Sequence, residues 1–110
     1  MSSFRIIVTP DAENDILELK NYIADVLLAP KTALSYIRSI RKEIGNLSEM
    51  PGRIKTVDNE PWHSLGIRRI TVKNFFVYYR IDEPNKTVYI LNIIYARRDQ
   101  LKALEKMNLN

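Results

Sequence analysis

Residues 66–95 read GIRRITVKNFFVYYRIDEPNKTVYILNIIY, a stretch in which runs of Ile, Val, Phe and Tyr are separated by two short polar segments. Runs of this composition that are bounded by turn residues are typical of β-strands. Lys73-Asn74 and the segment 82–86 are short enough to be the turns of β-hairpins. The pattern therefore predicts an antiparallel meander, with strands at 66–72, 75–81 and 87–95.

Upstream of this stretch, the sequence predicts one strand and two helices. Phe4–Val8 is short, apolar and rich in β-branched residues, so we expect a strand there. Thr9 can cap a helix, and Pro10 suits the first helical turn. Apolar residues then recur every three or four positions, as in an amphipathic helix, and a proline-containing break divides the run in two. The two helices, at roughly 10–28 and about 31–48, are expected to form an antiparallel hairpin.

The remaining segments complete an α+β fold with the order β-αα-βββ(-α). Residues 51–65 are polar and irregular, and Arg97–Met107 is expected as a short polar helix or tail. A helical hairpin that packs on one face of an antiparallel sheet buries both apolar helix stripes. We expect the opposite face to stay partly open for a large partner, and residues 1–110 to form a single domain.

The composition excludes several classes of site. The 110 residues include no Cys, one His and three Gly, which rules out disulfides, thiolate zinc sites, histidine-rich metal sites and glycine-rich phosphate loops. We expect no metal and no cofactor. The chain contains no apolar run long enough for a transmembrane helix and opens without a signal-peptide pattern. We therefore expect a cytoplasmic protein without a membrane partner.

Positive charge is concentrated in the second half of the chain. The total is +4, of which residues 1–50 carry −1 and residues 51–110 carry +5. A basic half-domain suits an acidic partner, either nucleic acid or an acidic protein segment. Period-2 alternation places Arg68 and Arg69 on opposite faces of their strand. The candidate residues for binding nucleic acid or another target are Arg53, Lys55, Arg68, Arg69, Arg80 and Arg98.

Aromatic residues lie among these cations, and two interpretations of them stay open. Tyr78 and Tyr79 either stack on unpaired bases beside phosphate-binding arginines or pack within the sheet. In the first case the cations would stabilise the negative charge that develops when RNA is cleaved by its own 2′-hydroxyl. We expect His63, beside Trp62, to anchor its loop, and the carboxylates of the helices, Asp15 among them, to be solvated surface.

Taken in order, the segments resemble the RelE/ParE toxin superfamily over nearly the whole chain. The resemblance is carried by VTPDAENDI at 8–16, Tyr22-Ile23, Leu47 with Pro51-Gly52-Arg53, and the segments 66–70, 77–81, 88–91 and 95–99. It implies the same fold and the role of toxin in a type II toxin–antitoxin module that inhibits growth and stabilises plasmids. It also implies a cognate antitoxin that wraps around the toxin, with operator DNA reached only through that antitoxin.

Two molecular targets follow from the resemblance. RelE-like members cut mRNA in the ribosomal A site, whereas ParE-like members poison DNA gyrase. The catalytic candidates for a RelE-like enzyme are Lys73 and Arg97, which fall near two arginines of those members. The tyrosine of RelE-type enzymes would fall near Ala103, and the ending Tyr95–Asp99 is more similar to ParE. We therefore expect a gyrase-directed protein; the alternatives are a ribosome-dependent endoribonuclease and an inactive homologue that acts as an antitoxin-binding co-repressor.

Overall fold

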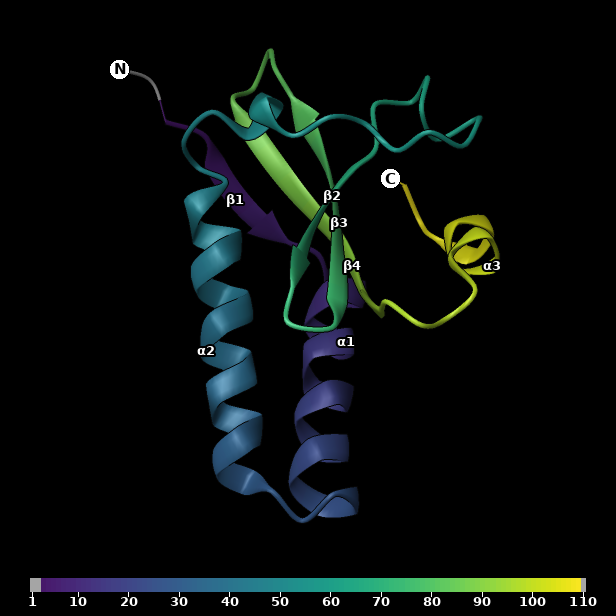
Figure 1. Cartoon of the computed structure of the whole chain (residues 1–110). Coiled ribbons are helices and arrows are strands. Elements are labelled where there is room, and N and C mark those ends of the chain that lie inside the picture. The colour runs from purple at the N-terminus through teal and green to yellow at the C-terminus, as the bar shows by residue number, and fades with distance from the viewer. Residues whose placement is uncertain (1–2, 110) are drawn as a thin grey trace.

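The computed structural model describes residues 3–109 as a four-stranded sheet with a helical hairpin on one side and a short helix on the other (Figure 1). Along the chain the elements are β1 (Arg5–Val8), α1 (Pro10–Asn21), the π-helix η1 (Tyr22–Val26), α2 (Pro30–Asn46), the 3₁₀ helix η2 (Pro51–Arg53), β2 (Arg68–Val72), β3 (Phe75–Asp82), β4 (Thr87–Tyr95) and α3 (Gln100–Lys106). This order confirms the expected α+β class, and the C-terminal segment is a helix rather than a tail.

The sheet has the strand order β1-β4-β3-β2 and is mixed. Strands β2, β3 and β4 form the antiparallel meander that the turn residues predict. Strand β1 instead runs parallel to β4, with Arg5 opposite Thr87 and Val8 opposite Ile90. Because β1 is joined to the meander through two helices and a long loop, no tight turn forces it to be antiparallel. The sequence predicts a purely antiparallel sheet, and this part of the prediction is wrong because β1 runs parallel to β4.

The hairpin starts where the sequence predicts, but its first arm does not stay α-helical throughout. Thr9 Oγ1 accepts a hydrogen bond from the Ala12 N–H (3.3 Å) and donates one to the Ile90 carbonyl (2.7 Å), so the helix cap is tied to β4. After α1 the chain widens into the π-helix η1, in which the Leu27 N–H donates to the Tyr22 carbonyl (3.1 Å). The expected helix of residues 10–28 is thus two consecutive helical segments.

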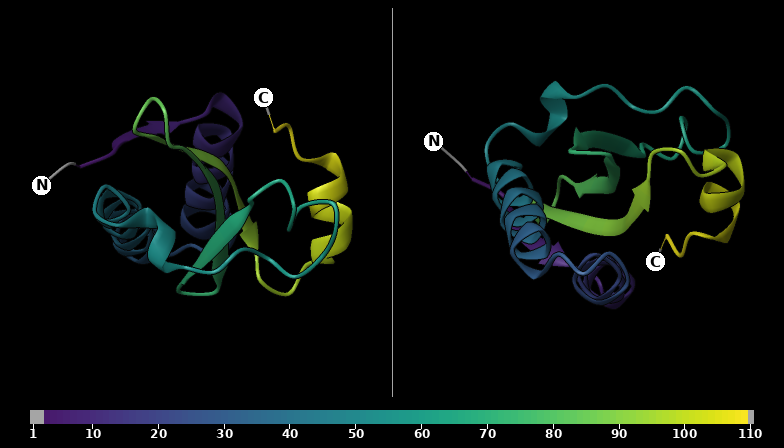
Figure 2. Two further views of the ribbon diagram at one scale, coloured as in Figure 1. Left: turned by 90° about the horizontal axis from the view of Figure 1, so that it is seen from above. Right: turned by 60° about the horizontal axis from the view of Figure 1, so that its bottom comes forward.

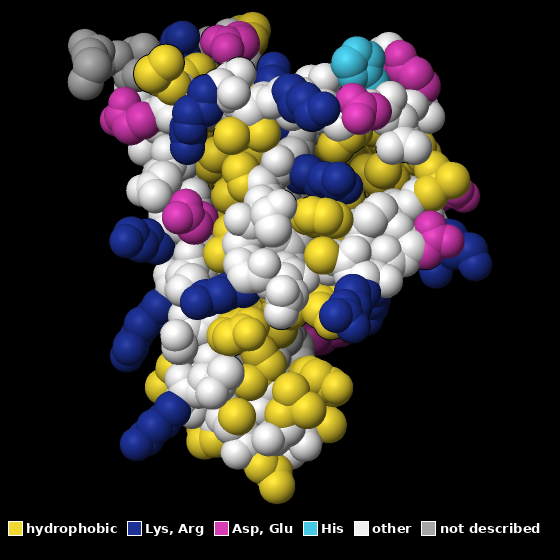
Figure 3. All heavy atoms as spheres, viewed as in Figure 1, with side chains coloured by type: hydrophobic (Ala, Val, Ile, Leu, Met, Phe, Trp, Pro, Cys, Tyr) yellow, Lys and Arg dark blue, Asp and Glu magenta, His cyan; other side chains and the backbone are white. Residues whose placement is uncertain are grey.

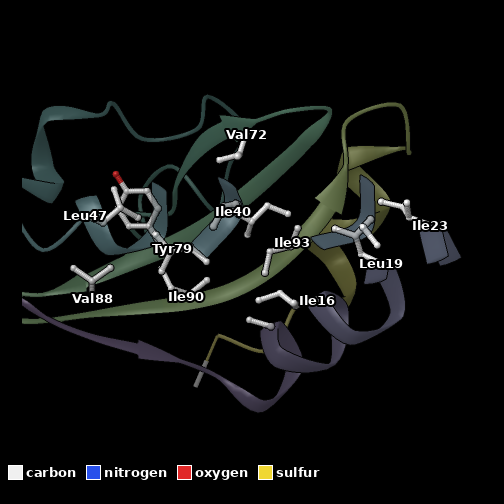
Figure 4. Close-up of a cluster of buried hydrophobic side chains, with 14 residues drawn as sticks. Ile16, Leu19, Ile23, Ile40, Leu47, Val72, Tyr79, Val88, Ile90 and Ile93 are labelled. Atoms are coloured by element: carbon white, nitrogen blue, oxygen red, sulfur yellow. The ribbon is translucent and has the colours of Figure 1, made fainter. Parts of the chain in front are cut away.

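Both apolar stripes of the hairpin pack against one face of the sheet. Ile16 of α1 and Ile40 of α2 meet Val88 and Ile90 of β4 in this first core (Figure 4). Tyr79 is fully buried there, and its hydroxyl donates a 2.8 Å hydrogen bond to a backbone carbonyl. Burial raises the pKa of the Tyr79 hydroxyl above its ordinary value of 10.0. The packing interpretation of Tyr79 is therefore confirmed.

The opposite face of the sheet is covered, contrary to expectation. Helix α3 and the loop before β2 lie on the side of the sheet away from the hairpin (Figure 2). The second core between them and the sheet consists of Val57, Trp62, Ile67, Tyr78, Leu91 and Leu104. Tyr78 is fully buried in it and cannot stack on bases. The face is closed because the segment 51–65, which reads as irregular and polar, carries two apolar anchors, Val57 and Trp62, and Ile67 adds a third just before β2.

Candidate functional site

The two arginines at the start of β2 lie on opposite faces of the sheet, as the alternation predicts. The Arg68 side chain donates from Nη1 to the carbonyl of Ile54. The Arg69 guanidinium lies on the α3 side, 3.9 Å from the centroid of the Phe76 ring, and donates a 3.1 Å hydrogen bond to the Tyr78 hydroxyl. Both arginines are thus partly committed to holding the fold together.

A cavity of about 300 Å³ opens beside Arg69 on the α3 side of the sheet. Its walls are the loop residues 54–59 together with Arg69, Gln100 and Leu104. Lys55, in this loop, is largely exposed, and its Nζ lies 3.7 Å from Asp58 Oδ1. The cavity is therefore lined by two of the candidate cations, Lys55 and Arg69, together with the carboxylate of Asp58.

The Tyr78 hydroxyl contacts two residues that line this cavity and is engaged in two hydrogen bonds. Tyr78 accepts from Arg69 and donates to Gln100 Oε1 at 2.7 Å. Gln100 in turn donates from Nε2 to the carbonyls of Tyr95 (2.9 Å) and Arg98 (2.8 Å). This chain of hydrogen bonds fixes the start of α3 to the sheet, so the Tyr78 hydroxyl has a structural role.

Lys73 and Arg97 lie at one end of the sheet, outside the cavity. The Ala96 N–H donates to the Asn74 carbonyl (2.8 Å), which joins the turn after β4 to the turn between β2 and β3. Lys73 Nζ lies 5.7 Å from the centroid of the Tyr36 ring, which belongs to α2 on the hairpin side. The turns thus bring the two catalytic candidates to one end of the sheet, but neither residue lines the cavity beside Arg69.

Two further candidate cations, Arg53 and Arg80, line neither the cavity beside Arg69 nor the larger groove at the end of the sheet. Arg53 donates from Nη1 to the carbonyls of Glu49 (2.6 Å) and Met50 (3.0 Å), just after α2. Arg80 lies 4.2 Å from the centroid of the Tyr89 ring on the neighbouring strand. Lysine and arginine side chains are likewise dispersed over the face shown in Figure 3. The structure therefore does not assemble all of the candidates into one basic patch.

A larger groove, of about 730 Å³, lies between the hairpin and the end of the sheet. Its α1 wall carries the carboxylates Asp15 and Glu18, and Arg98, the remaining candidate cation, lies in its lining. The apolar part of the lining includes Leu19, Tyr22, Ile23, Phe75, Ile93 and Tyr95. An apolar groove with charges of both signs at its borders suits an amphipathic segment of a partner protein.

Asp15 is part of this groove and is not the solvated carboxylate that we expected. Its Oδ2 accepts hydrogen bonds from Asn92 Nδ2 (2.8 Å) and from the Ile93 N–H (2.9 Å). Burial raises the pKa of Asp15 above its ordinary value, and the two hydrogen bonds offset this only in part. The sequence held a signal for this position, because Asp15 falls within the apolar stripe between Ala12 and Ile16.

His63 and Trp62 anchor their loop, as expected. His63 Nδ1 lies 2.9 Å from both the Thr56 hydroxyl and the Val57 carbonyl oxygen, and Trp62 is buried in the second core. Across residues 3–109, no group of three or more His, Cys, Asp or Glu residues is arranged to hold a metal ion. Nor does this part of the chain include a helix long and apolar enough to cross a membrane.

Comparison with known proteins identifies the family to which the chain belongs. Residues 6–100 match the family model of the ParE toxin of type II toxin–antitoxin system, parDE. Because this match spans most of the chain, the chain belongs to the ParE toxin family of type II toxin–antitoxin systems. No curated protein sequence matches it.

Solved structures share the fold of this chain. The chromosomal ParDE toxin–antitoxin system of Pseudomonas aeruginosa includes a chain with a TM-score of 0.71 at 21% identity, over 86% of this chain and 98% of that one. A chain of the RelBE2 toxin–antitoxin complex of Mycobacterium tuberculosis gives 0.59 at 22% identity, over 84% and 98%. A mutant of the E. coli toxin RelE in the free state gives 0.62 at 13% identity, over 94% and 93%. At these identities the likeness is one of fold.

Proposed function

We propose that this toxin inhibits growth by binding DNA gyrase in the cytoplasm, and that it does not cleave RNA. The observation that carries the proposal is the position of the two catalytic candidates, Lys73 and Arg97, which do not line the cavity beside Arg69. Cleavage of RNA by its own 2′-hydroxyl needs a base, an acid and stabilisation of negative charge. The cavity beside Arg69 gathers cations that suit the third requirement, but neither of the two catalytic candidates lines it.

Four residues support this conclusion. The Tyr78 hydroxyl is buried and engaged in two hydrogen bonds, so it is a poor acid or base. Lys73 and Arg97 lie outside the cavity. Ala103 of α3 stands near the position where the resemblance places a tyrosine in RelE-type enzymes, and its methyl group transfers no proton. A binding inhibitor needs none of these groups, since a complementary surface is enough.

The groove between the hairpin and the sheet is the proposed site of the cognate antitoxin. We expect an amphipathic antitoxin segment to place apolar side chains against Phe75 and Tyr95. Basic side chains of that segment would lie toward Asp15 and Glu18, and an acidic one toward Arg98. Because apolar burial is not screened by salt, the complex should survive a few hundred millimolar salt, unlike binding that depends on phosphate contacts. In this proposal operator DNA is bound by the antitoxin and not by this chain.

A charge reversal in the groove tests the antitoxin proposal. Arg98→Glu should weaken antitoxin binding in calorimetry, because it places a carboxylate opposite the acidic side chain of the partner. Lys106→Glu is the matched control, since it makes the same change of charge on an exposed position of α3 outside the groove. Equal affinities for the two variants would contradict this placement of the antitoxin.

A supercoiling assay tests the target. Purified toxin, DNA gyrase and relaxed plasmid should show loss of supercoiling, and Lys73→Ala and Arg97→Ala should leave this inhibition unchanged. The endoribonuclease is the second candidate, because the cavity beside Arg69 gathers two cations. Primer extension on an mRNA translated by purified ribosomes tests it. Cuts that appear only with ribosomes and disappear in the two variants would overturn the gyrase proposal. Normal growth of cells that express the chain without antitoxin would contradict both and favour the inactive co-repressor.

A further inference from the structure

The hairpin extends beyond the sheet, and its tip carries exposed apolar side chains (Figures 1 and 3). The members of this surface, here named the tip patch, are Tyr22, Val26, Leu27, Leu28 and Leu34. Their exposed fractions range from 48% at Leu34 to 81% at Leu28. A soluble protein seldom leaves so many large apolar side chains together in water, and such patches mark interaction sites.

Two backbone irregularities coincide with the tip patch. The chain widens from α1 into the π-helix Tyr22–Val26. Such π-helical turns are rare in proteins, but those that occur are often found at functional sites. Leu28 then adopts a left-handed conformation, with φ at 53°. This conformation is unfavourable for a leucine and persists only where the surroundings impose it. Since the Leu28 side chain is mostly in solvent, packing of that side chain within this chain does not compensate for the strain.

The charges at the tip indicate what kind of surface fits it. Residues 22–34 contain one acidic side chain, Asp25 on the first arm, and one basic side chain, Lys31 on the second. Both are exposed, and neither takes part in an ion pair within residues 3–109. A nucleic acid or an anionic lipid surface would call for clustered Lys and Arg, which the tip lacks. A neutral apolar surface with one charge of each sign is instead complementary to itself.

We propose that two copies of this chain associate through their tip patches in a two-fold symmetric dimer. In such an interface residue i contacts residue j of the partner, and j contacts i. Asp25 on the first arm would then face the partner's Lys31 on the second arm, and the reverse pair would form at the same time. Val26, Leu28 and the partner's equivalents would fill the centre.

The size of the patch sets the strength of this association. Stable dimers bury about 800 Å² on each partner, which is more than five partly exposed side chains can supply. The dimer is therefore weak, and its population depends on protein concentration. Val26, Leu28 and Leu34 lie outside the lining of the groove proposed for the antitoxin. Tyr22 and Leu27 of the tip patch do line that groove, so the dimer is proposed for the chain without antitoxin, and an antitoxin bound in the groove would compete with it.

Sedimentation of the purified full chain over a range of concentrations tests the dimer. Leu28→Asn should raise the dimer dissociation constant by at least about tenfold, because each dimer would bury two copies of Leu28. Asn also tolerates the left-handed backbone, so the variant should fold, which its circular dichroism and melting curve will check. Leu101→Gln is the matched control: it removes an exposed leucine from α3, far from the tip, and should leave association unchanged.

Charge exchange then tests the symmetry. Asp25→Lys and Lys31→Glu should each weaken self-association, because each places like charges opposite one another. An equimolar mixture of the two variants should form a heterodimer at least as readily as the wild type, since both contacts are then between opposite charges. A wild-type chain that stays monomeric at every concentration would overturn the proposal. So would a mixture that associates no better than the separate variants, or equal effects of Leu28→Asn and Leu101→Gln.

Discussion

We predict that the packing of α3 in the second core stabilises the protein, and two leucines of this helix can test the prediction. Leu104 faces the sheet from α3 and is 3% exposed, whereas Leu101 on the same helix is 47% exposed. Replacing each by Ala shortens the same side chain in the same short helix, with little change in helix propensity. The difference between the two variants therefore isolates what the packing of α3 on the sheet contributes to stability.

The structure sets the size of the effect. Truncating a buried leucine to alanine costs about 2–5 kcal/mol of unfolding free energy, from lost burial and from the cavity left behind. Leu104 also lines the cavity beside Arg69, where the loop has room to relax, so we expect the lower part of that range, about 2–3 kcal/mol. Leu101→Ala should cost less than about 1 kcal/mol, as is usual at exposed positions.

Urea unfolding followed by circular dichroism measures both values. Leu104→Ala should shift the midpoint with little change in slope, and its α3 amides should exchange hydrogen faster than those of the wild type. If the two variants lose stability equally, within about 0.5 kcal/mol, then α3 does not pack on the sheet as described. The face opposite the hairpin would in that case be open in solution.

Three further changes probe other parts of the fold. Tyr79→Phe should lower the unfolding free energy by about 1–3 kcal/mol, because it leaves the buried carbonyl of Pro51 without its 2.8 Å hydrogen bond; urea titration at neutral pH measures the loss. Asp15 has a raised pKa in the folded state, so its favourable contribution is complete below its ordinary value of 3.8 and is lost as pH rises through the raised value. The unfolding free energy of Asp15→Asn should therefore improve relative to the wild type from acidic to neutral pH, and a difference that does not vary with pH would contradict this. Met50 has φ at 49° and is 73% exposed, so Met50→Gly should raise the unfolding free energy by about 0.5–1 kcal/mol in thermal melts; a lower melting temperature would count against strain at this position.

The meander could be predicted because its signals are local. The last strand was expected at 87–95, and β4 spans Thr87–Tyr95. Short turns of polar residues between β-rich runs fix both the pairing and its direction. The direction of β1 has no such signal, because its partner lies more than eighty residues further along the chain and no turn connects them. Its parallel pairing is decided by tertiary packing alone.

The candidate site was predictable only in part, for a related reason. Alternation along a strand is enough to place Arg68 and Arg69 on opposite faces. The covering of the second face depends on Val57 and Trp62, which are scattered in an irregular loop and follow no period. From the alternation alone that face is expected to stay open, and Tyr78 can either stack on bases or pack within the sheet. The roles of Lys73, Arg97 and the target-binding cations stay predictions until the assays above are done.

Because β1 pairs with β4, the sheet cannot be completed before β4 has been synthesised. Arg5 pairs with Thr87, and β4, which joins β1 to the rest of the sheet, is the last strand to be synthesised. Until that strand has left the ribosome, β1 has no partner, and the apolar stripes of the hairpin lack most of the sheet that covers them. A copy whose synthesis stops before residue 87 can complete neither core, because both include residues of β4. Only a chain translated through β4 can therefore complete the sheet and both cores.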